Sequence, residues 1–398
     1  MNVLFIHPNF PAQFRHLAQL LGSTGHNVIF ATENARPEWE IPGVAKAVYK
    51  LGKAPEENSQ LFQPLLQATA HAEAMLLLGE DLKKRGFVPD VVYGASGWGG
   101  TWFARDLFPQ AKLIGYFEWY YHADSPDVMF DRQETLSTQY RARLRLRNTV
   151  MINDLLSCDL CITPSQWQRQ QFPPVFRDRI AVLHDGIDTE YFSPSTEVSL
   201  NIPGLPLTGR ETIVTYATRG MEPYRGFPQF IESLPLILNK NPDCHIIIAG
   251  EDRICYGSKR SDGKTWKEAM LDRVPLPADR VHFVGSLPYG QYRQLLRCSD
   301  VHVYLTRPFV LSWSALEAMS CGCLLVASDT EPVREVIRDE VNGLLTDFHS
   351  PEKIAGRVLY ALENRNTCVN LRRNARETIK SYFNLKSTLA RQMAILSR

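Results

Sequence analysis

Short β-branched runs alternate with longer helical patterns along this chain, and that alternation limits its fold more than any other feature. Such alternation is typical of βαβ units, whose strands join parallel sheets. We therefore predict an α/β fold with doubly wound sheets. In the first half the predicted strands are Asn2–Ile6, Asn27–Ala31, Val91–Tyr93, Lys112–Tyr116, Leu160–Thr163 and Ile180–Leu183, with helices at Phe62–Lys84 and Arg132–Leu156.

A stretch rich in Pro, Ser, Gly and Thr interrupts this alternation before it restarts. We predict a first domain at 1–193, a linker at 194–210, a second domain at 211–375, and a C-terminal helix at 376–398 that packs back on the first domain. Ligands of such sheets bind beyond the carboxyl ends of the strands, here in a cleft between the domains. Predicted strands of the second half are Ile213–Ala217, His245–Ala249, Val281–Val284, Val301–Leu305 and Cys323–Ala327.

Composition excludes several classes of protein. The 44 basic and 43 acidic residues nearly cancel, so the chain has no overall electrostatic footprint for nucleic acid. Its eight scattered cysteines fit reduced thiols in a cytoplasm, and no His or Cys set at zinc spacing surrounds them. The apolar N-terminus, Met1–Ile6, is too short for a signal peptide or membrane span. We expect a cytoplasmic protein without a metal site.

The loop after Ile213–Ala217 carries two arginines around a Pro/Gly turn. Arg219 and Arg225 are six residues apart, so both guanidinium groups can fold onto one polyanion. Arginine is suited to the paired oxygens of a phosphate group. The alternative is a pair of solvated surface arginines.

A second loop follows Val301–Leu305 and runs into a helix that begins near Ser312–Ser314. Unpaired N–H groups at a helix start form a binding site for a diphosphate. Glu317 lies one turn into this helix, where a carboxylate can accept two ribose hydroxyls. Its neighbours are apolar, so we expect Glu317 to be partly buried and to have partners.

Glycine turns follow two other strands of the second half. Gly285 follows Val281–Val284 and lets a nucleobase approach the backbone. Gly250 forms a similar turn after His245–Ala249. Each turn is a weak signal by itself.

Taken in order, these loops resemble a known family. The order Arg-x5-Arg-Gly, Ala-Gly-Glu-Asp, Phe-Val-Gly-x-Leu and Ser-Ala-Leu-Glu-Ala-Met-Ser-Cys-Gly-Cys-x-x-Val-Ala-Ser-Asp is similar to that of the retaining glycosyltransferases of family 4. The resemblance continues at Pro332–Ile337, Asn342–Leu345 and Leu183–Pro194, and is detailed over residues 158–347. It implies the GT-B fold, in which two Rossmann-like domains face a central cleft.

The resemblance also implies the chemistry. The donor would be a nucleoside-diphosphate sugar as co-substrate, with no cofactor, no metal and retained anomeric configuration (a hexosyltransferase-like enzyme). Arg219 and Arg225 match the basic pair on the phosphates, and Glu317 matches the ribose ligand. The predicted donor-binding residues are Arg219, Gly220, Arg225, Gly250, Val284, Gly285, Leu287, Phe309, Leu311, Ser312, Trp313, Ser314 and Glu317.

Two positions depart from the family pattern. The family has Glu-x7-Glu in the second loop, and here Phe309 stands in place of the first glutamate, which leaves the donor sugar open. Many members have a histidine just after the strand that corresponds to Lys112–Tyr116. Glu118 is nearest that place and His122 lies four residues on. We predict that Glu118 takes the polar role near the reacting sugar, with His122 as the rival, so the predicted catalytic residues are Glu118, His122, Arg219 and Arg225.

The loops of the first half would border the acceptor. The predicted acceptor-side residues are Asn9, Phe10, Gln13, Ser96, Gly97, Trp98 and Trp119. Arg141, Arg143, Arg145 and Arg147 share one helical stretch and could hold an anionic membrane surface or a lipid-diphosphate acceptor. A solvated helix face is the alternative.

Together these features predict a glycosyltransferase acting on a glycan, a lipid-linked sugar or a small molecule. Two alternatives remain open. One is a catalytically silent nucleotide-sugar-binding partner subunit, and the other is a nucleotide-sugar enzyme of the same fold, such as an epimerase. The sequence leaves open the base, the sugar, the linkage, the oligomeric state and peripheral membrane contact.

Overall fold

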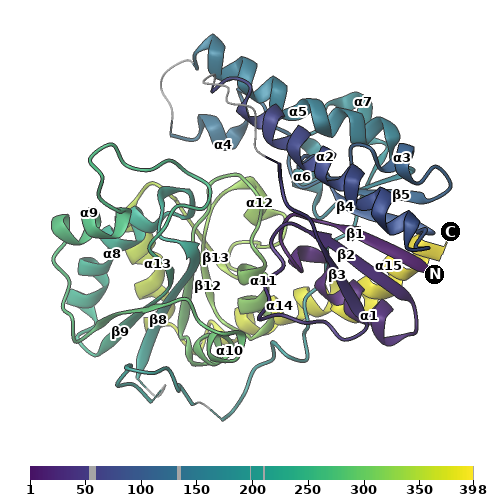
Figure 1. The fold of residues 1–398 in the computed structure, drawn as a ribbon. Coiled ribbons are helices and arrows are strands. Elements are labelled where there is room, and N and C mark those ends of the chain that lie inside the picture. Colours follow the sequence, from purple (N-terminus) through teal and green to yellow (C-terminus); the bar gives the residue numbers. More distant parts are fainter. Residues whose placement is uncertain (53–59, 132–135, 198, 209–210, 398) are drawn as a thin grey trace. The chain divides into compact units, whose positions relative to one another are not determined.

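The structure, a computed structural model, describes residues 1–52, 60–131, 136–197, 199–208 and 211–397 (Figure 1). The chain forms two compact units. The first contains Met1–Asp185 and the C-terminal segment from Lys386, and the second contains Gly186–Leu385. Each unit is built on one open sheet whose paired strands all run parallel, as the sequence predicts.

The sheet of the first unit has seven strands in the order β3-β2-β1-β4-β5-β6-β7. Buried apolar side chains on its two faces form two core clusters, one with Leu4 and Leu113, the other with Phe5 and Ile114. These alternating neighbours lie on opposite faces, as the period of a strand requires. The strands are β1 Asn2–Ile6, β2 Asn27–Thr32, β3 Val44–Val48, β4 Val91–Ala95, β5 Lys112–Tyr116, β6 Leu160–Thr163 and β7 Ile180–Val182.

Helices cover both faces of this sheet. They are α1 Arg15–Ser23, α2 Gln63–Lys84, α3 Ala104–Leu107, α4 Pro126–Met129, α5 Thr138–Ser157, α6 Gln166–Gln170, α7 Pro174–Arg177 and α15 Leu385–Ser397, with a 3-10 turn at Ala12–Phe14. The helix predicted over Arg132–Leu156 corresponds to α5, and its first four residues, 132–135, lie outside the described part of the chain. No described helix is both long and apolar enough to cross a bilayer.

The sheet of the second unit has six strands in the order β10-β9-β8-β11-β12-β13. The strands are β8 Thr212–Gly220, β9 Cys244–Glu251, β10 Val281–Gly285, β11 Val301–Tyr304, β12 Leu325–Ser328 and β13 Leu344–Thr346. The helices are α8 Phe227–Lys240, α9 Trp266–Arg273, α10 Tyr289–Cys298, α11 Trp313–Ser320, α12 Glu331–Arg334, α13 Pro351–Glu363 and α14 Val369–Tyr382, with a 3-10 turn at Pro223–Arg225.

The structure divides the chain differently from the predicted boundaries. The predicted linker belongs to the second unit, because Leu200, Ile202 and Leu207 are buried in a core cluster with Ile213 and Ile247. The described residues of this segment therefore pack on a sheet, although their composition resembles that of a linker.

The C-terminal helix also begins later than predicted. Residues 376–382 are part of α14, which buries Ala375 and Ile379 in the core of the second unit. Only the chain from Lys386 belongs to the first unit, where Leu396 lies in the core and Lys112 Nζ donates to the carbonyl of Ile395 at 2.5 Å.

Candidate functional site

The site-forming loops of the second unit follow β8, β9, β10 and β11. These strands are neighbours in one parallel sheet, so their carboxyl ends meet at the same edge. The sheet thereby brings together the loops that the sequence singled out. Gly226, which ends the β8 loop, has φ +66°, and a Cβ there would lie 2.6 Å from Leu305 Cβ. The β8 and β11 loops are therefore packed tightly enough to require glycine.

Arg225 lies in the loop after β8 at this edge of the sheet, and it is buried, with 7% of its surface exposed. Its Nη1 donates to Thr306 Oγ1 at 2.6 Å, to the Tyr304 hydroxyl at 3.2 Å and to the Val310 carbonyl at 3.2 Å. All of these acceptors are neutral, and among the described residues no carboxylate forms an ion pair with Arg225. A buried cation without a counter-charge is costly, so this position is suited to bind an anion.

Tyr304 joins Arg225 to the start of helix α11. Its hydroxyl accepts from the backbone N–H of Ser312 at 2.9 Å as well as from Arg225. Ser312 is the N-cap of α11, and its hydroxyl accepts from Ser314 N–H at 3.3 Å. The guanidinium and the positive end of the helix dipole are thus fixed relative to each other.

The other predicted donor residues lie on the same loops with different exposure. Arg219, at the end of β8, is exposed, whereas Gly220 is buried. Gly285 has φ +68° and open space beside it. The remaining residues of this set, Gly250, Val284, Leu287, Leu311 and Trp313, lie at the ends of β9 and β10 or beside the start of α11.

Glu317 is buried to 6% exposure on α11, as its apolar neighbours predict. The Tyr289 hydroxyl lies 3.4 Å from Glu317 Oε1. Burial and the charge of Glu317 hold the pKa of Tyr292 well above its usual value. Tyr289 is 40% exposed, so it lies at the surface next to the predicted ribose ligand. Tyr289 was not among the predicted site residues.

Phe309 belongs to an aromatic cluster that we define as Tyr224, Tyr256 and Phe309. The three rings come from the loops after β8, β9 and β11. Phe309 meets Tyr224 at 5.5 Å and Tyr256 at 5.7 Å, both edge to face, and the two tyrosines are 5.9 Å apart. The position where the resemblance implies a carboxylate therefore carries a ring that packs against two tyrosine rings.

The predicted catalytic residues of the first unit are placed as follows. Glu118 is exposed, whereas its neighbours Phe117 and Trp119 are buried. His122 Nε2 lies 2.5 Å from the Gln171 carbonyl, which can only accept, so this nitrogen carries the proton. The His122 imidazole therefore holds the loop to residue 171, and only Nδ1 is left for other chemistry.

The acceptor-side residues divide by burial. Phe10 and Trp119 are buried, Phe10 against Phe30 at 4.9 Å, because their rings complete the core instead of facing solvent. Trp98 is 44% exposed and lies 6.3 Å from the ring of His7. Asn9 is exposed, Gln13 is half-buried, and Ser96 and Gly97 belong to the loop after β4.

Asp154 of α5 holds this β4 loop and was not predicted. Its carboxylate accepts from the hydroxyls of Ser96 at 2.7 Å and Thr101 at 2.8 Å. Burial raises the pKa of Asp154 to about 6. His7 was also missed, and burial lowers its pKa to about 4. His7 follows the apolar strand β1 directly, and this pattern would have pointed to it.

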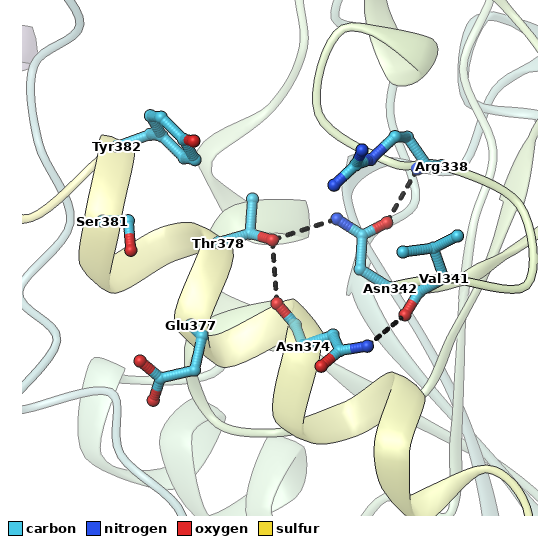
Figure 2. Close-up of a pocket in the computed structure, with 8 residues that line it drawn as sticks. All are labelled: Arg338, Val341, Asn342, Asn374, Glu377, Thr378, Ser381 and Tyr382. Carbon is cyan, nitrogen blue, oxygen red and sulfur yellow. Dashed lines mark hydrogen bonds between the residues drawn. The ribbon is translucent and has the colours of Figure 1, made fainter.

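A separate hollow of about 350 Å³ lies between the segment 338–342 and helix α14 (Figure 2). Asn342 bridges the two, donating to Thr378 Oγ1 at 3.1 Å and accepting from Arg338 N–H at 2.7 Å. Asn374 donates to the Val341 carbonyl at 2.9 Å. None of the predicted site residues lines this hollow, and these bonds hold the turn to the helix.

Comparisons with known proteins agree with this architecture. A model of the "Glycosyl transferase family 4 group" matches residues 24–192, and a model of "Glycosyl transferases group 1" matches residues 202–378. An uncharacterized glycosyltransferase of Methanocaldococcus jannaschii is 32% identical over 119 residues, 30% of each chain. D-inositol 3-phosphate glycosyltransferase of Corynebacterium glutamicum is 23% identical over 52% of this chain. The chain spans 48% of the length of the latter.

Solved structures show the same fold over the whole chain. Sucrose-phosphate synthase of Thermosynechococcus elongatus has a TM-score of 0.75 at 20% identity, covering 100% of this chain and 98% of its own. Anabaena HepE in complex with UDP-glucose has a TM-score of 0.68 at 17% identity, covering 100% and 99%. With both halves matched by family models and both sheets matched by these structures, the chain belongs to the group 1 glycosyltransferases of family 4 and has their GT-B fold of two Rossmann-like domains.

Proposed function

We propose that this protein is a retaining glycosyltransferase that moves a sugar from a nucleoside-diphosphate donor to a glycan, a lipid-linked sugar or a small-molecule acceptor. The observation that carries the proposal is Arg225, a buried guanidinium whose hydrogen-bond acceptors among the described residues are all neutral. A diphosphate would supply the missing negative charge.

Other residues at the same edge of the sheet would bind the remaining groups of the donor. Arg219 and the N-terminus of α11 would share the phosphates with Arg225, and Glu317 would accept the ribose hydroxyls. Anabaena HepE, which has the same fold, was solved in complex with UDP-glucose, and this supports a nucleotide sugar as donor.

In the proposed reaction the bond between the sugar C1 and the β-phosphate oxygen breaks. A bond from C1 to the acceptor oxygen forms on the same face of the ring. The acceptor hydroxyl proton passes to the departing diphosphate, which leaves as nucleoside diphosphate. The guanidinium groups and the helix start would stabilise the charge that accumulates on the leaving phosphate, so the proposal requires no metal.

A donor screen tests the proposal. UDP, GDP, ADP and dTDP are titrated by calorimetry, and nucleotide release from the matching sugars is then followed over hours. We expect one nucleotide to bind and its sugar to be hydrolysed slowly without acceptor. If none of the nucleotides binds to folded protein, the assignment of Arg225 is wrong.

Phe309 favours a second candidate, a catalytically silent partner subunit, because it replaces a carboxylate with a ring. The same screen separates the two functions. A silent subunit would bind a nucleotide sugar and raise its own melting temperature, but would release no nucleotide even with acceptors present.

A further inference from the structure

The loops after β1 and β4 bring an exposed tryptophan and a buried histidine together in the first unit. Strands β1 and β4 pair in parallel, so the residues that follow them lie at the same edge of the sheet, where ligands of such sheets bind. His7 directly follows β1, and Trp98 is the third residue after β4. Their ring centres are 6.3 Å apart. The proposed donor site in the second unit uses neither residue.

The indole of Trp98 is held in solvent by a constrained loop. The residue is 44% exposed, and its two neighbours, Gly97 and Gly99, have φ +88° and +96°. A Cβ at Gly99 would lie 2.0 Å from the carbonyl oxygen of Ala68, so helix α2 packs directly against the loop. The buried carboxyl group of Asp154 holds the same loop through two hydroxyl groups. The loop therefore presents a large apolar ring to solvent at a fixed place, which suits a ligand with an apolar face.

His7 supplies a polar group beside this ring. Its side chain is 8% exposed, and burial lowers its pKa to about 4, so the imidazole is neutral at pH 7. Nδ1 of His7 accepts the backbone N–H of Asn9 at 2.9 Å, so the proton of the neutral ring is on Nε2. No described residue accepts a hydrogen bond from Nε2. A buried ring thus keeps an N–H donor for a ligand, because leaving it unpaired is costly.

We propose that Trp98 and His7 form an acceptor subsite for a pyranose ring, so that the acceptor is itself a sugar. The inference rests on the proposed function, because it takes the bound sugar to be the acceptor. One face of a pyranose consists of C–H groups that stack on an indole, and the hydroxyl oxygens at its rim accept from an N–H donor. An apolar chain would cover the indole but leave the His7 N–H unpaired, and a neutral imidazole adds no charge to hold an anion.

Binding of simple sugars tests the subsite without a donor. The methyl pyranosides of glucose, galactose, mannose and N-acetylglucosamine are added to the full chain, and saturation-transfer NMR reports which ligand protons contact it. We expect the ring protons of at least one pyranoside to receive saturation. Sorbitol, which has hydroxyl groups but no ring, and hexanol, which has an apolar chain and a single hydroxyl group, should receive little.

Matched variants assign the contact, with the pyranoside that binds used as acceptor. Trp98→Ala should raise the acceptor KM about 10-fold with a smaller change in kcat, whereas Trp98→Phe keeps a ring and most of the affinity. His7→Asn keeps an oxygen for the Asn9 N–H but loses the Nε2 donor, and should raise this KM about 3- to 10-fold. His7→Gln places an amide N–H near Nε2 and should restore much of the affinity.

The fold of each variant is verified by melting curves and by the affinity for free nucleotide. Trp98 lies at the surface, so its pair of variants decides if the His7 variants do not fold. The subsite is wrong if no pyranoside receives saturation, if sorbitol or hexanol receives as much, or if Trp98→Ala receives as much as wild type. None of these results affects the donor screen.

The remaining outcomes separate the acceptor role from the proposed function. If a pyranoside binds through Trp98 but receives no sugar from a donor that the protein hydrolyses, the acceptor role is wrong and the proposed function stands. If a pyranoside binds through Trp98 but no nucleotide binds, the proposed function fails and the acceptor role fails with it.

Discussion

Each unit buries an ionisable group that has no ion-pair partner in the part of the chain that the structure describes, but the two groups differ in their surroundings. In the second unit Arg225 is a buried cation at the carboxyl edge of the sheet, with neutral partners from the end of β11 and the loop that follows it. In the first unit Asp154 is a buried acid whose Oδ2 accepts from the Ser96 and Thr101 hydroxyls of the loop after β4. The buried cation is suited to bind an anionic ligand. The carboxyl group of Asp154 already has hydrogen-bond donors in the loop that it holds. This difference supports the proposal that Arg225 binds an anionic ligand, whereas Asp154 holds the loop after β4.

The largest expected effect tests whether the first unit also contributes to chemistry. We expect Glu118→Gln to lower kcat about 10²-fold or more at saturating donor, because a carboxylate there would stabilise positive charge developing at C1. His122→Ala is the comparison variant, and its imidazole already holds the Gln171 carbonyl. Near-normal turnover in Glu118→Gln together with inactivity in His122→Ala would transfer the role to His122.

Arg225→Ala should be next in size. We expect nucleoside-diphosphate affinity to fall by about 1.5–3 kcal/mol, the range for hydrogen bonds to charged groups. Arg219→Ala should cost less than Arg225→Ala, because Arg219 is exposed and its interaction is screened by solvent. Calorimetric titration of both variants measures the difference. Equal losses would show that burial does not distinguish the two arginines, and unchanged affinity in both would remove the phosphate assignment.

Glu317→Gln tests whether the second unit binds the phosphates and the ribose of the donor through different residues. We expect the affinity for the nucleoside diphosphate to fall about 10-fold, the loss of roughly one hydrogen bond to a charged group, while that for inorganic diphosphate stays unchanged. Tyr289→Phe is the matched control, since it removes only the hydroxyl 3.4 Å from Glu317. Equal losses for both ligands in Glu317→Gln would make this residue structural.

The sequence predicted residues that stand in one short motif better than residues that come together only in the fold. The predicted donor residues of the second unit stand in short motifs after strands, so spacing alone was enough to select Arg225, Glu317 and the start of α11 as candidates. The aromatic cluster was missed because Tyr224, Tyr256 and Phe309 come from three separate loops, and only the sheet order brings them together. Asp154 was missed for the same reason, since it lies 58 residues from Ser96.

The fold errors have a physical cause as well. The edge strands β3 and β13 were not predicted. The first is only partly buried along its length and lacks an apolar run, and the second is three residues long. The segment 194–210 was taken for a linker because burial of Leu200, Ile202 and Leu207 depends on a neighbouring sheet rather than on local periodicity. The other two edge strands, β7 and β10, were predicted, so local pattern missed particular edge strands rather than edges in general.

The smallest expected effect concerns pH, where the buried acid of the first unit and a buried histidine of the second act in opposite directions. Asp154 has its pKa raised to about 6, so the folded state binds more protons than the unfolded state between about pH 4 and 6. Its contribution to stability is present below that window and is lost as the pH rises. Burial lowers the pKa of His302 to about 4, so the unfolded state binds more protons between about pH 4 and 6.5. The contribution of His302 is present at neutral pH and is lost as the pH falls.

Two substitutions separate these contributions. Asp154→Asn should make the loss of stability from about pH 6 to 4 steeper, because it removes the group that takes up a proton on folding. His302→Gln should make the loss shallower, and its amide can still bond to the Thr215 hydroxyl, which lies 2.7 Å from His302 Nδ1. Melting temperatures at half-unit steps of pH should diverge from wild type in opposite directions, by about 2–4 °C for each kcal/mol of difference. Parallel curves for wild type and both variants would show that neither group titrates in this window.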